Sequence, residues 1–163
     1  MIMMIYLIIL LIGLVFGSFL NVLIHRLPLS ISLVKPAGSA CPHCNNGIKW
    51  YENIPVASYL ALKGRCSNCS ESISIIYPIV EIITAIVTLT IYLNFLFNWE
   101  LIAIIALFYT LIVLSFIDLK YRAVPDYLLI IAVILAIMVG DIISVLIFTG
   151  GLVLLELAIT FYI

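Results

Sequence analysis

The sequence predicts an all-α polytopic membrane protein with about five transmembrane helices and a cytoplasmic loop that holds four cysteines. Of its 163 residues, 66% are hydrophobic and 9% are charged, and the mean hydropathy is +1.38. Soluble domains are roughly 45–50% apolar and about 25% charged, so a soluble protein is excluded. The expected domains are a first membrane helix over residues 1–25, a four-cysteine loop over 26–77 and a membrane domain over 78–163.

The first apolar run covers residues 1–24, which meets the roughly 20 residues that cross a bilayer. It has no preceding basic residue and no small-residue cleavage site, so we expect an uncleaved helix that ends at Pro28 rather than a signal peptide. Gly13 and Gly17 form a small-xxx-small pair, which lets a second helix approach closely. Three polar residues on one face favour helix packing over a functional stripe: Ser18, Asn21 and His25.

The only long polar segment, residues 26–77, holds all four cysteines in two Cys-x2-Cys pairs separated by 21 residues: Cys41, Cys44, Cys66 and Cys69. Four thiolates at this spacing are typical of a closed tetrahedral zinc site. The alternatives are two disulfides or four free thiols. Disulfides need an oxidising compartment, whereas the excess of Lys and Arg indicates the cytoplasm. We therefore expect a zinc-ribbon-like site, without His43 as a ligand, that stabilises a loop with too small a core to fold alone.

Aromatic residues between the two cysteine pairs have two alternative locations. Trp50, Tyr51 and Tyr59 either pack on the metal core or lie at the membrane interface, where Trp and Tyr are enriched. The sequence does not decide between them.

The second span begins at Tyr77-Pro78, with proline at the favoured first helical position, and runs to about Phe97. Glu81 lies three residues into this helix. Its carboxylate is either favoured by the positive end of the helix dipole or functional. After a short turn over residues 98–100, the third span runs from about Leu101 to Ile117.

The stretch over residues 116–126 is the largest cluster of charge between long apolar runs in the last two fifths of the chain. It holds four charged residues: Asp118, Lys120, Arg122 and Asp126. A carboxylate at the end of a membrane helix is costly to bury, so Asp118 is the first candidate for chemistry. A fourth span is expected from about Tyr127 to Gly140, and a fifth from Ile142 to Ile163.

The positions of Lys and Arg predict the orientation in the membrane. Five of the seven fall between residues 26 and 65, and the other two flank Tyr121. If residues 26–77 are cytoplasmic, the alternation of spans also places Lys120 and Arg122 in the cytoplasm, as the positive-inside rule requires. The N-terminus is then outside, and Asp118 shares the cytoplasmic face with the four-cysteine loop. The expected partner is the lipid bilayer, with no nucleic acid.

Short motifs occur in a fixed order between residues 13 and 126. They are Gly17-Ser18-Phe19-Leu20-Asn21-Val22 with Arg26-Leu27-Pro28, the two Cys-x2-Cys pairs, Glu52-Asn53-Ile54-Pro55, Lys63-Gly64-Arg65-Cys66, Tyr77-Pro78-Ile79-Val80-Glu81, and Ile117-Asp118 followed by Val124-Pro125-Asp126. No motif is decisive alone, but the ordered set resembles the type IV prepilin peptidases, which are polytopic membrane aspartic proteases of the prepilin leader peptidase/N-methyltransferase family.

The resemblance implies cleavage of the basic leader peptide from prepilins and pseudopilins at the cytoplasmic face of the cell (inner) membrane. For members with the four-cysteine loop it also implies N-methylation of the new terminus with S-adenosylmethionine. By the family pattern, Asp118 matches the first catalytic aspartate and Asp126 a structural position. Glu52 and Glu81 are the candidates for a methylation or substrate site.

The chain departs from the family pattern at the second catalytic aspartate, which the family carries in a Gly-x-Gly-Asp motif. Met138-Val139-Gly140-Asp141 lacks the first glycine, and the predicted topology places Asp141 outside. An aspartic protease needs two carboxylates that share one proton, and Pro125 argues against one helix that carries both Asp118 and Asp126. We therefore expect the N-terminal part of a longer enzyme, or a natural short form, that alone does not cleave prepilin.

Two other classes of function remain open. One is a non-catalytic membrane module whose zinc loop docks a partner in pilus or secretion assembly. The other is a small ion transporter that uses Asp118 and Glu156. Glu156 lies inside the predicted fifth span, where a carboxylate indicates either an ion pathway or a buried, protonated side chain.

Overall fold

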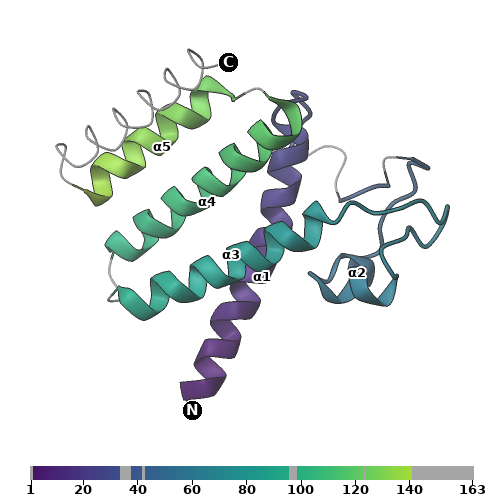
Figure 1. Ribbon diagram of the computed structural model, residues 1–163, viewed down its shortest axis with the longest axis horizontal. Coiled ribbons are helices and arrows are strands. Elements are labelled where there is room, and N and C mark those ends of the chain that lie inside the picture. The colour runs from purple at the N-terminus through teal and green to yellow at the C-terminus, as the bar shows by residue number, and fades with distance from the viewer. Residues whose placement is uncertain (1, 34–37, 42, 96–98, 123, 141–163) are drawn as a thin grey trace, which may run out of the picture.

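The computed structural model describes residues 2–33, 38–41, 43–95, 99–122 and 124–140. Over these ranges it contains helices and isolated bridges but no β-strand, so the all-α prediction is confirmed (Figure 1). The helices are α1 (Ile2–Arg26), a short 3-10 helix η1 (Trp50–Asn53), α2 (Ala57–Ala61), α3 (Ile76–Asn94), α4 (Trp99–Tyr121) and α5 (Asp126–Val139).

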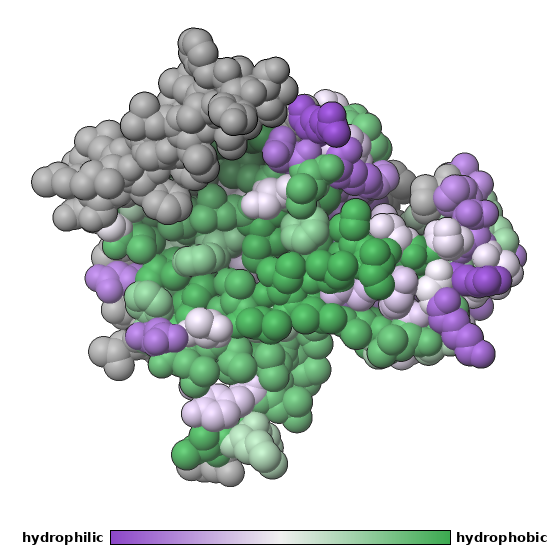
Figure 2. Space-filling view, in the orientation of Figure 1, coloured by the Kyte–Doolittle hydropathy of each residue, from purple (hydrophilic) through white to green (hydrophobic). Residues whose placement is uncertain are grey.

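Three of these helices, α1, α3 and α4, are long and apolar enough to cross a membrane. Hydrophobic residues cover most of the face of these helices that Figure 2 shows. The protein is therefore a multi-pass membrane protein. The fourth predicted span is present as α5, but its 14 residues fall short of the roughly 20 that a bilayer needs. The fifth predicted span, with Asp141 and Glu156, lies outside the described residues.

The backbones of α1 and α3 are in contact because Gly13 and Gly17 lack side chains. A Cβ atom at Gly13 would lie 2.6 Å from Cα of Ala85, and one at Gly17 would lie 2.6 Å from Cα of Glu81. Both distances are shorter than non-bonded carbon atoms allow, so only glycine fits at these two positions. The prediction of a close helix approach is confirmed. Asn21, on the same face, is buried and donates a hydrogen bond to the Tyr77 carbonyl at 3.1 Å.

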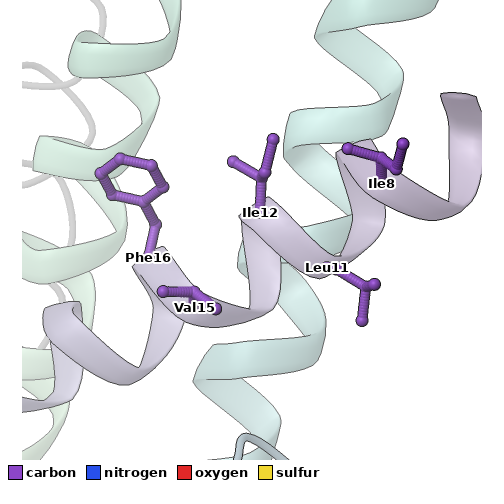
Figure 3. Close-up of a pocket in the computed structure, with 5 residues that line it drawn as sticks. All are labelled: Ile8, Leu11, Ile12, Val15 and Phe16. Atoms are coloured by element: carbon purple, nitrogen blue, oxygen red, sulfur yellow. The ribbon is translucent and has the colours of Figure 1, made fainter.

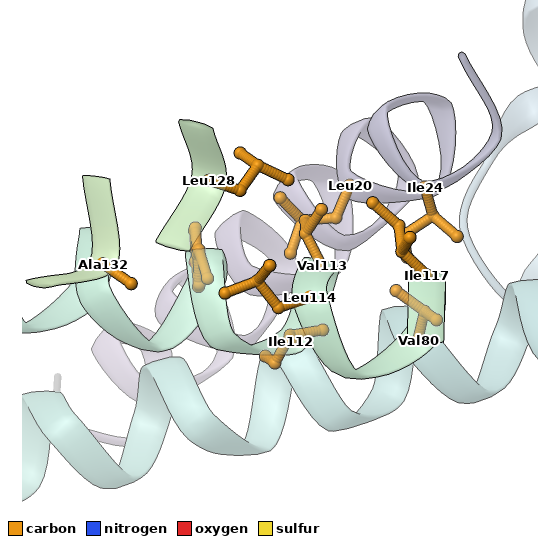
Figure 4. Close-up of a cluster of buried hydrophobic side chains, with 10 residues drawn as sticks. Leu20, Ile24, Val80, Ile112, Val113, Leu114, Ile117, Leu128 and Ala132 are labelled. Atoms are coloured by element: carbon orange, nitrogen blue, oxygen red, sulfur yellow. The ribbon is translucent and has the colours of Figure 1, made fainter. Parts of the chain in front are cut away.

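The core lies where α1, α3, α4 and α5 meet, toward the end of the bundle from which the loop leaves (Figure 4). We call this the loop end: it holds the last turn of α1, the first turn of α3 and the last turn of α4 (Figure 1). The buried cluster contains Leu20, Ile24, Val80, Tyr109, Ile112, Val113, Leu114, Ile117, Leu128 and Ala132. Farther along, the Thr88 and Tyr109 hydroxyls share a 2.7 Å hydrogen bond between α3 and α4.

Two helix boundaries differ from the predicted ones in ways that matter for the site. α3 begins at Ile76, so Pro78 is its third residue, where a missing N–H still costs no intrahelical bond. Glu81 therefore lies beyond the first turn, and the helix-dipole explanation for it is wrong. α4 continues to Tyr121, so Asp118 lies in its last turn rather than after it.

Candidate functional site

Each cysteine pair is held in a tight loop built from the same backbone hydrogen bonds. In the first loop, Cys41 N–H donates to the Asn46 carbonyl at 3.0 Å, and Asn45 N–H donates to the Cys41 carbonyl at 2.8 Å. The same pair of bonds, at 2.8 and 3.0 Å, recurs in the second loop among Cys66, Ser70 and Glu71. The two loops are therefore copies of one local structure.

The similarity between the two cysteine loops extends beyond the cysteines themselves. The residue after the second cysteine has a positive φ in both loops, 53° at Asn45 and 60° at Ser70. An antiparallel bridge closes each loop, Ala40 with Gly47 and Arg65 with Ser72. The sequence shows this repeat only through its cysteine spacing, because the hydrogen bonds come from backbone groups that leave no signature in residue types.

The two loops bring all four cysteines into one cluster. Their Sγ atoms lie within 4.8 Å of one another, and the Sγ atoms of Cys41 and Cys69 are 3.8 Å apart. A tetrahedral metal with metal–sulfur bonds near 2.3 Å would separate its ligands by about 3.8 Å, whereas a disulfide needs about 2.05 Å. All four thiols are free. The cluster can therefore hold a metal ion, and the structure does not contain the alternative disulfides.

Hydrogen-bond donors around the cluster favour thiolates, which are the metal-binding form. The Asn46 amide and the Asn68 side chain, whose Nδ2 lies 3.6 Å from Sγ of Cys44, lower the pKa of the Cys44 thiol to about 6. The Glu71 amide acts the same way on Cys69, but desolvation and the neighbouring thiols outweigh it and raise the pKa of Cys69 to about 12. Protons would therefore compete with a metal ion held by this cluster.

The pH dependence follows from the sign of the Cys44 shift. Its folded-state pKa lies below the ordinary value of 9.0, so its contribution to stability is full above about pH 9 and is lost as the pH falls toward 6. We expect metal to leave the protein on acidification below this range, which a metal-sensitive dye would detect.

Asn68 tunes the cluster without ligating it. We expect Asn68→Ala to weaken metal binding by about 10-fold, because it removes a side-chain donor to the Cys44 sulfur. The matched control is Asn46→Ala, since Asn46 acts on Cys44 through its backbone amide, which alanine keeps. Competition against a chelator measures both affinities, and equal affinities for the two variants would contradict the role of Asn68.

Glu52 is tied into the loop by two hydrogen bonds. Its carboxylate accepts one from the Lys49 N–H at 3.1 Å, which caps η1. The Ser67 hydroxyl, and then the Lys49 amide, lower the pKa of the carboxyl group below its usual range. Glu52 therefore joins η1 to the second cysteine loop.

Glu81 connects α3 to the middle of the loop. Its side chain is buried and accepts a hydrogen bond from the Val56 N–H at 2.7 Å. Val56 has φ 59° and ψ −48°, and Ala57 N–H bonds to the Pro55 carbonyl across it. This is a γ-turn of the rare, strained kind, and it turns the Val56 N–H toward Glu81. Sequence reasoning missed this contact because a backbone donor carries no mark in the sequence.

Loss of the Glu81 acceptor should loosen the loop. We expect Glu81→Ala to lower the free energy of unfolding by about 1–3 kcal/mol, because the Val56 N–H loses its partner in a partly buried site. Glu81→Gln keeps an acceptor oxygen and should restore part of the loss. The control is Glu71→Ala, which removes an exposed carboxylate, and cleavage of residues 50–62 by a protease provides a local readout.

Asp118 projects from the loop end of the bundle. It is exposed, in the last turn of α4, directly after the fully buried Ile117. The helix ends where Arg122, at φ 51°, donates its N–H to the Asp118 carbonyl at 2.8 Å. Asp126 is also exposed and is the first residue of α5. The two carboxylates thus lie on different helices, as the proline between them predicts.

The structure joins some of the predicted site residues and separates others. The four cysteines form one cluster, Glu52 belongs to the loop around it, and Glu81 holds that loop against α3. Val80, next to Glu81, and Ile117, next to Asp118, belong to the same buried core. Arg26 adds a further tie, since its guanidinium donates to three carbonyls of the loop: Ser32, Leu33 and Gly38.

Comparisons with known proteins agree with the motifs. Residues 11–95 match the family model for the bacterial peptidase A24 N-terminal domain. Three similar proteins carry the name prepilin leader peptidase/N-methyltransferase. The one from Myxococcus xanthus is 44% identical over 113 residues, those from Stutzerimonas stutzeri and Pseudomonas aeruginosa 38% over 141 residues.

These matches cover 69%, 73% and 72% of the chain, but only 33%, 49% and 48% of the relatives. The chain therefore spans one third to one half of the length of these relatives. No solved structure matches the chain significantly.

Proposed function

The chain belongs to the bacterial peptidase A24 N-terminal domain family, and we propose that it takes part in processing prepilins as part of a membrane aspartic endopeptidase. The domains proposed are the first membrane helix over residues 1–25, the four-cysteine loop over 26–77 and the membrane part of the peptidase over 78–163. The substrates proposed are prepilins or pseudopilins, whose leader is cut at the cytoplasmic face of the cell membrane.

One observation carries the proposal: Asp118 is an exposed carboxylate on a rigid support. Ile117, immediately before it, has no exposed surface and packs in the core shared by four helices. A catalytic group needs such support, because small displacements of a reacting group cost large factors in rate. Asp118 is therefore the proposed catalytic residue, as a general base toward water or as its acid counterpart.

A second carboxylate must share the proton with Asp118. Asp126 is a poor candidate, since it starts a different helix after Pro125. We propose that the second carboxylate comes from outside the described residues, which agrees with the half-length coverage of the relatives.

The proposed metal is one structural zinc ion. Cys41, Cys44, Cys66 and Cys69 fit it by number, by sulfur chemistry and by the 3.8 Å separation of Cys41 and Cys69. A closed four-thiolate shell leaves no open position for a substrate, so the zinc stabilises the loop and takes no part in cleavage. The cytoplasmic placement of this loop, with the N-terminus outside, rests on its Lys and Arg residues.

Methylation with S-adenosylmethionine is proposed from the relatives' name alone. Glu52 and Glu81 are the carboxylates proposed for a methylation or substrate site, and one oxygen of each accepts a backbone hydrogen bond within the loop. We therefore derive no methyl-transfer step from them.

A chimera tests the proposed peptidase role. Membranes that contain the 163-residue chain alone should not cleave a prepilin. The chimera joins residues 1–126 to the part of the Stutzerimonas stutzeri relative that follows the equivalent position, and membranes that contain it should cleave the prepilin. In the chimera, Asp118→Asn should reduce cleavage by about 10²–10⁴-fold, and the matched change Asp126→Asn should leave most of the activity. Cleavage that survives Asp118→Asn, or a metal-loaded chimera that never cleaves, would contradict the proposal.

A further inference from the structure

We propose that residues 50–61, the interfacial segment, lie in the membrane interface of the leaflet at the loop end and insert apolar side chains among lipid acyl chains. The segment comprises η1, the γ-turn at Val56 and α2. The proposal concerns the bilayer as a binding partner of the loop and does not depend on peptidase activity.

The interfacial segment contacts α1 below the end of that helix. Asn53 and Pro55 line a hollow together with Val15, Ser18, Phe19 and Val22 of α1. These α1 residues lie four to eleven positions before Arg26, so at 1.5 Å per residue the contact lies about 6–16 Å below the end of that helix. Tilt of α1 shortens these distances along the membrane normal but keeps their order.

Helix α3 gives the same result independently. Glu81, which binds the Val56 N–H, lies five residues after the start of α3 at Ile76. This is about 8 Å along the helix. Both flanking helices thus place the middle of the interfacial segment below the helix ends. The 8 Å from α3 falls within the depth of about 5–10 Å to which interfacial helices insert, and the 6–16 Å from α1 overlaps it.

Several apolar side chains of the interfacial segment are exposed. Trp50 is 82% exposed, Leu60 68% and Ile54 44%. Of the two locations that the sequence left open for Trp50, this exposure is not compatible with packing on the metal core, and the membrane interface is the one we adopt. Trp is enriched there because its ring is apolar while its N–H stays near water.

The interfacial segment adjoins the exposed apolar surface of α1. A shallow hollow along α1 is lined by five exposed apolar residues: Ile8, Leu11, Ile12, Val15 and Phe16 (Figure 3). Val15 also lines the hollow that includes Asn53 and Pro55. In Figure 2 hydrophobic surface continues from the helices onto the part of the loop where α2 lies, whereas hydrophilic residues gather at the outer edge of the loop. Acyl chains along α1 would thus meet the segment directly.

Charge at the ends of the segment fits the same location. Lys49 immediately precedes Trp50, and Lys63 follows shortly after Ala61. Both side chains belong to exposed residues, so their ammonium groups can reach phosphate headgroups while the apolar residues between them insert.

Fluorescence quenching tests the depth, because the chain has only two tryptophans, Trp50 and Trp99. The Trp99→Phe variant is reconstituted into phosphatidylcholine vesicles in which part of the lipid carries bromine at acyl positions 6 and 7 or 11 and 12. We expect the shallow bromine to quench Trp50 by about half, the deep bromine less, and aqueous iodide only weakly. Leu60→Trp in a Trp50→Phe/Trp99→Phe background should behave in the same way.

The matched control places a tryptophan on the second cysteine loop, as Glu71→Trp in the Trp50→Phe/Trp99→Phe background. Iodide should quench this control strongly and brominated lipid should not. Iodide quenching of Trp50 as strong as that of the control would overturn the proposal. Shielding of Trp50 from both quenchers would also overturn the proposal, because it would mean that Trp50 is buried in protein. Quenching of the control by brominated lipid as strong as that of Trp50 would overturn the proposal too.

Discussion

Replacing Cys41 or Cys66 by serine is expected to abolish metal binding and to unfold the four-cysteine loop. The wild-type protein should contain about one zinc ion per chain, and the variants less than about a tenth of that. We expect the loop to depend on the metal because its own core is small: Cys41 is its only buried hydrophobic residue among those described between residues 38 and 75. Structural zinc contributes about 10–16 kcal/mol to such folds.

Metal analysis and limited proteolysis measure this effect, the second through new cleavage sites between residues 38 and 75. The control is His43→Ala, an exposed residue between the ligands that lies outside the sulfur cluster. It should keep the metal and the protease resistance. Purified protein with no metal and oxidised thiols would refute both the zinc site and the cytoplasmic placement of the loop.

Gly17→Ala is expected to destabilise the helix bundle by about 1–3 kcal/mol. The added Cβ would meet Cα of Glu81 at 2.6 Å, and backbone, unlike a flexible side chain, cannot move aside. The helices must separate, which weakens the packing around Leu20 and also shifts the carboxylate that holds Val56. Gly17→Leu should be worse, because its larger side chain forces the helices farther apart.

Gly47→Ala is the matched control for this substitution. Gly47 has open space around its Cα, and its φ is not positive. Both substitutions add one methyl group and restrict the unfolded chain equally, so the difference between them isolates the contact of α1 with α3. Unfolding in detergent measures the difference, and equal stabilities would show that α1 and α3 are not in backbone contact.

The sequence predicted those features that depend on residues close together in the chain. Two Cys-x2-Cys pairs are typical of one metal site, so their spacing, with the excess of Lys and Arg in the same segment, favoured a single cluster of four cysteines. Gly13 and Gly17 lie one helical turn apart, so they mark a contact face whatever helix packs there. The apolar runs likewise predicted α1, α3 and α4, since their length and composition suffice to predict a membrane span.

Helix ends were predicted less well because they depend on weak and competing signals. α4 runs to Tyr121 since Leu119 and Lys120 are good helix formers and the chain turns only at Arg122. α3 begins before Pro78 because the third helical position needs no N–H. These shifts of a few residues changed the interpretation of Glu81 and the place of Asp118.

By itself, therefore, the sequence determined the membrane class, the four-cysteine cluster, the close helix pair and Asp118 as a charge beside a membrane helix. Only the tertiary structure decided that α3 is the helix against Gly17, that Glu81 holds the backbone of Val56, and that the side chain of Trp50 is exposed. The physical reason is that these contacts join residues tens of positions apart, several of them through backbone atoms that every residue shares.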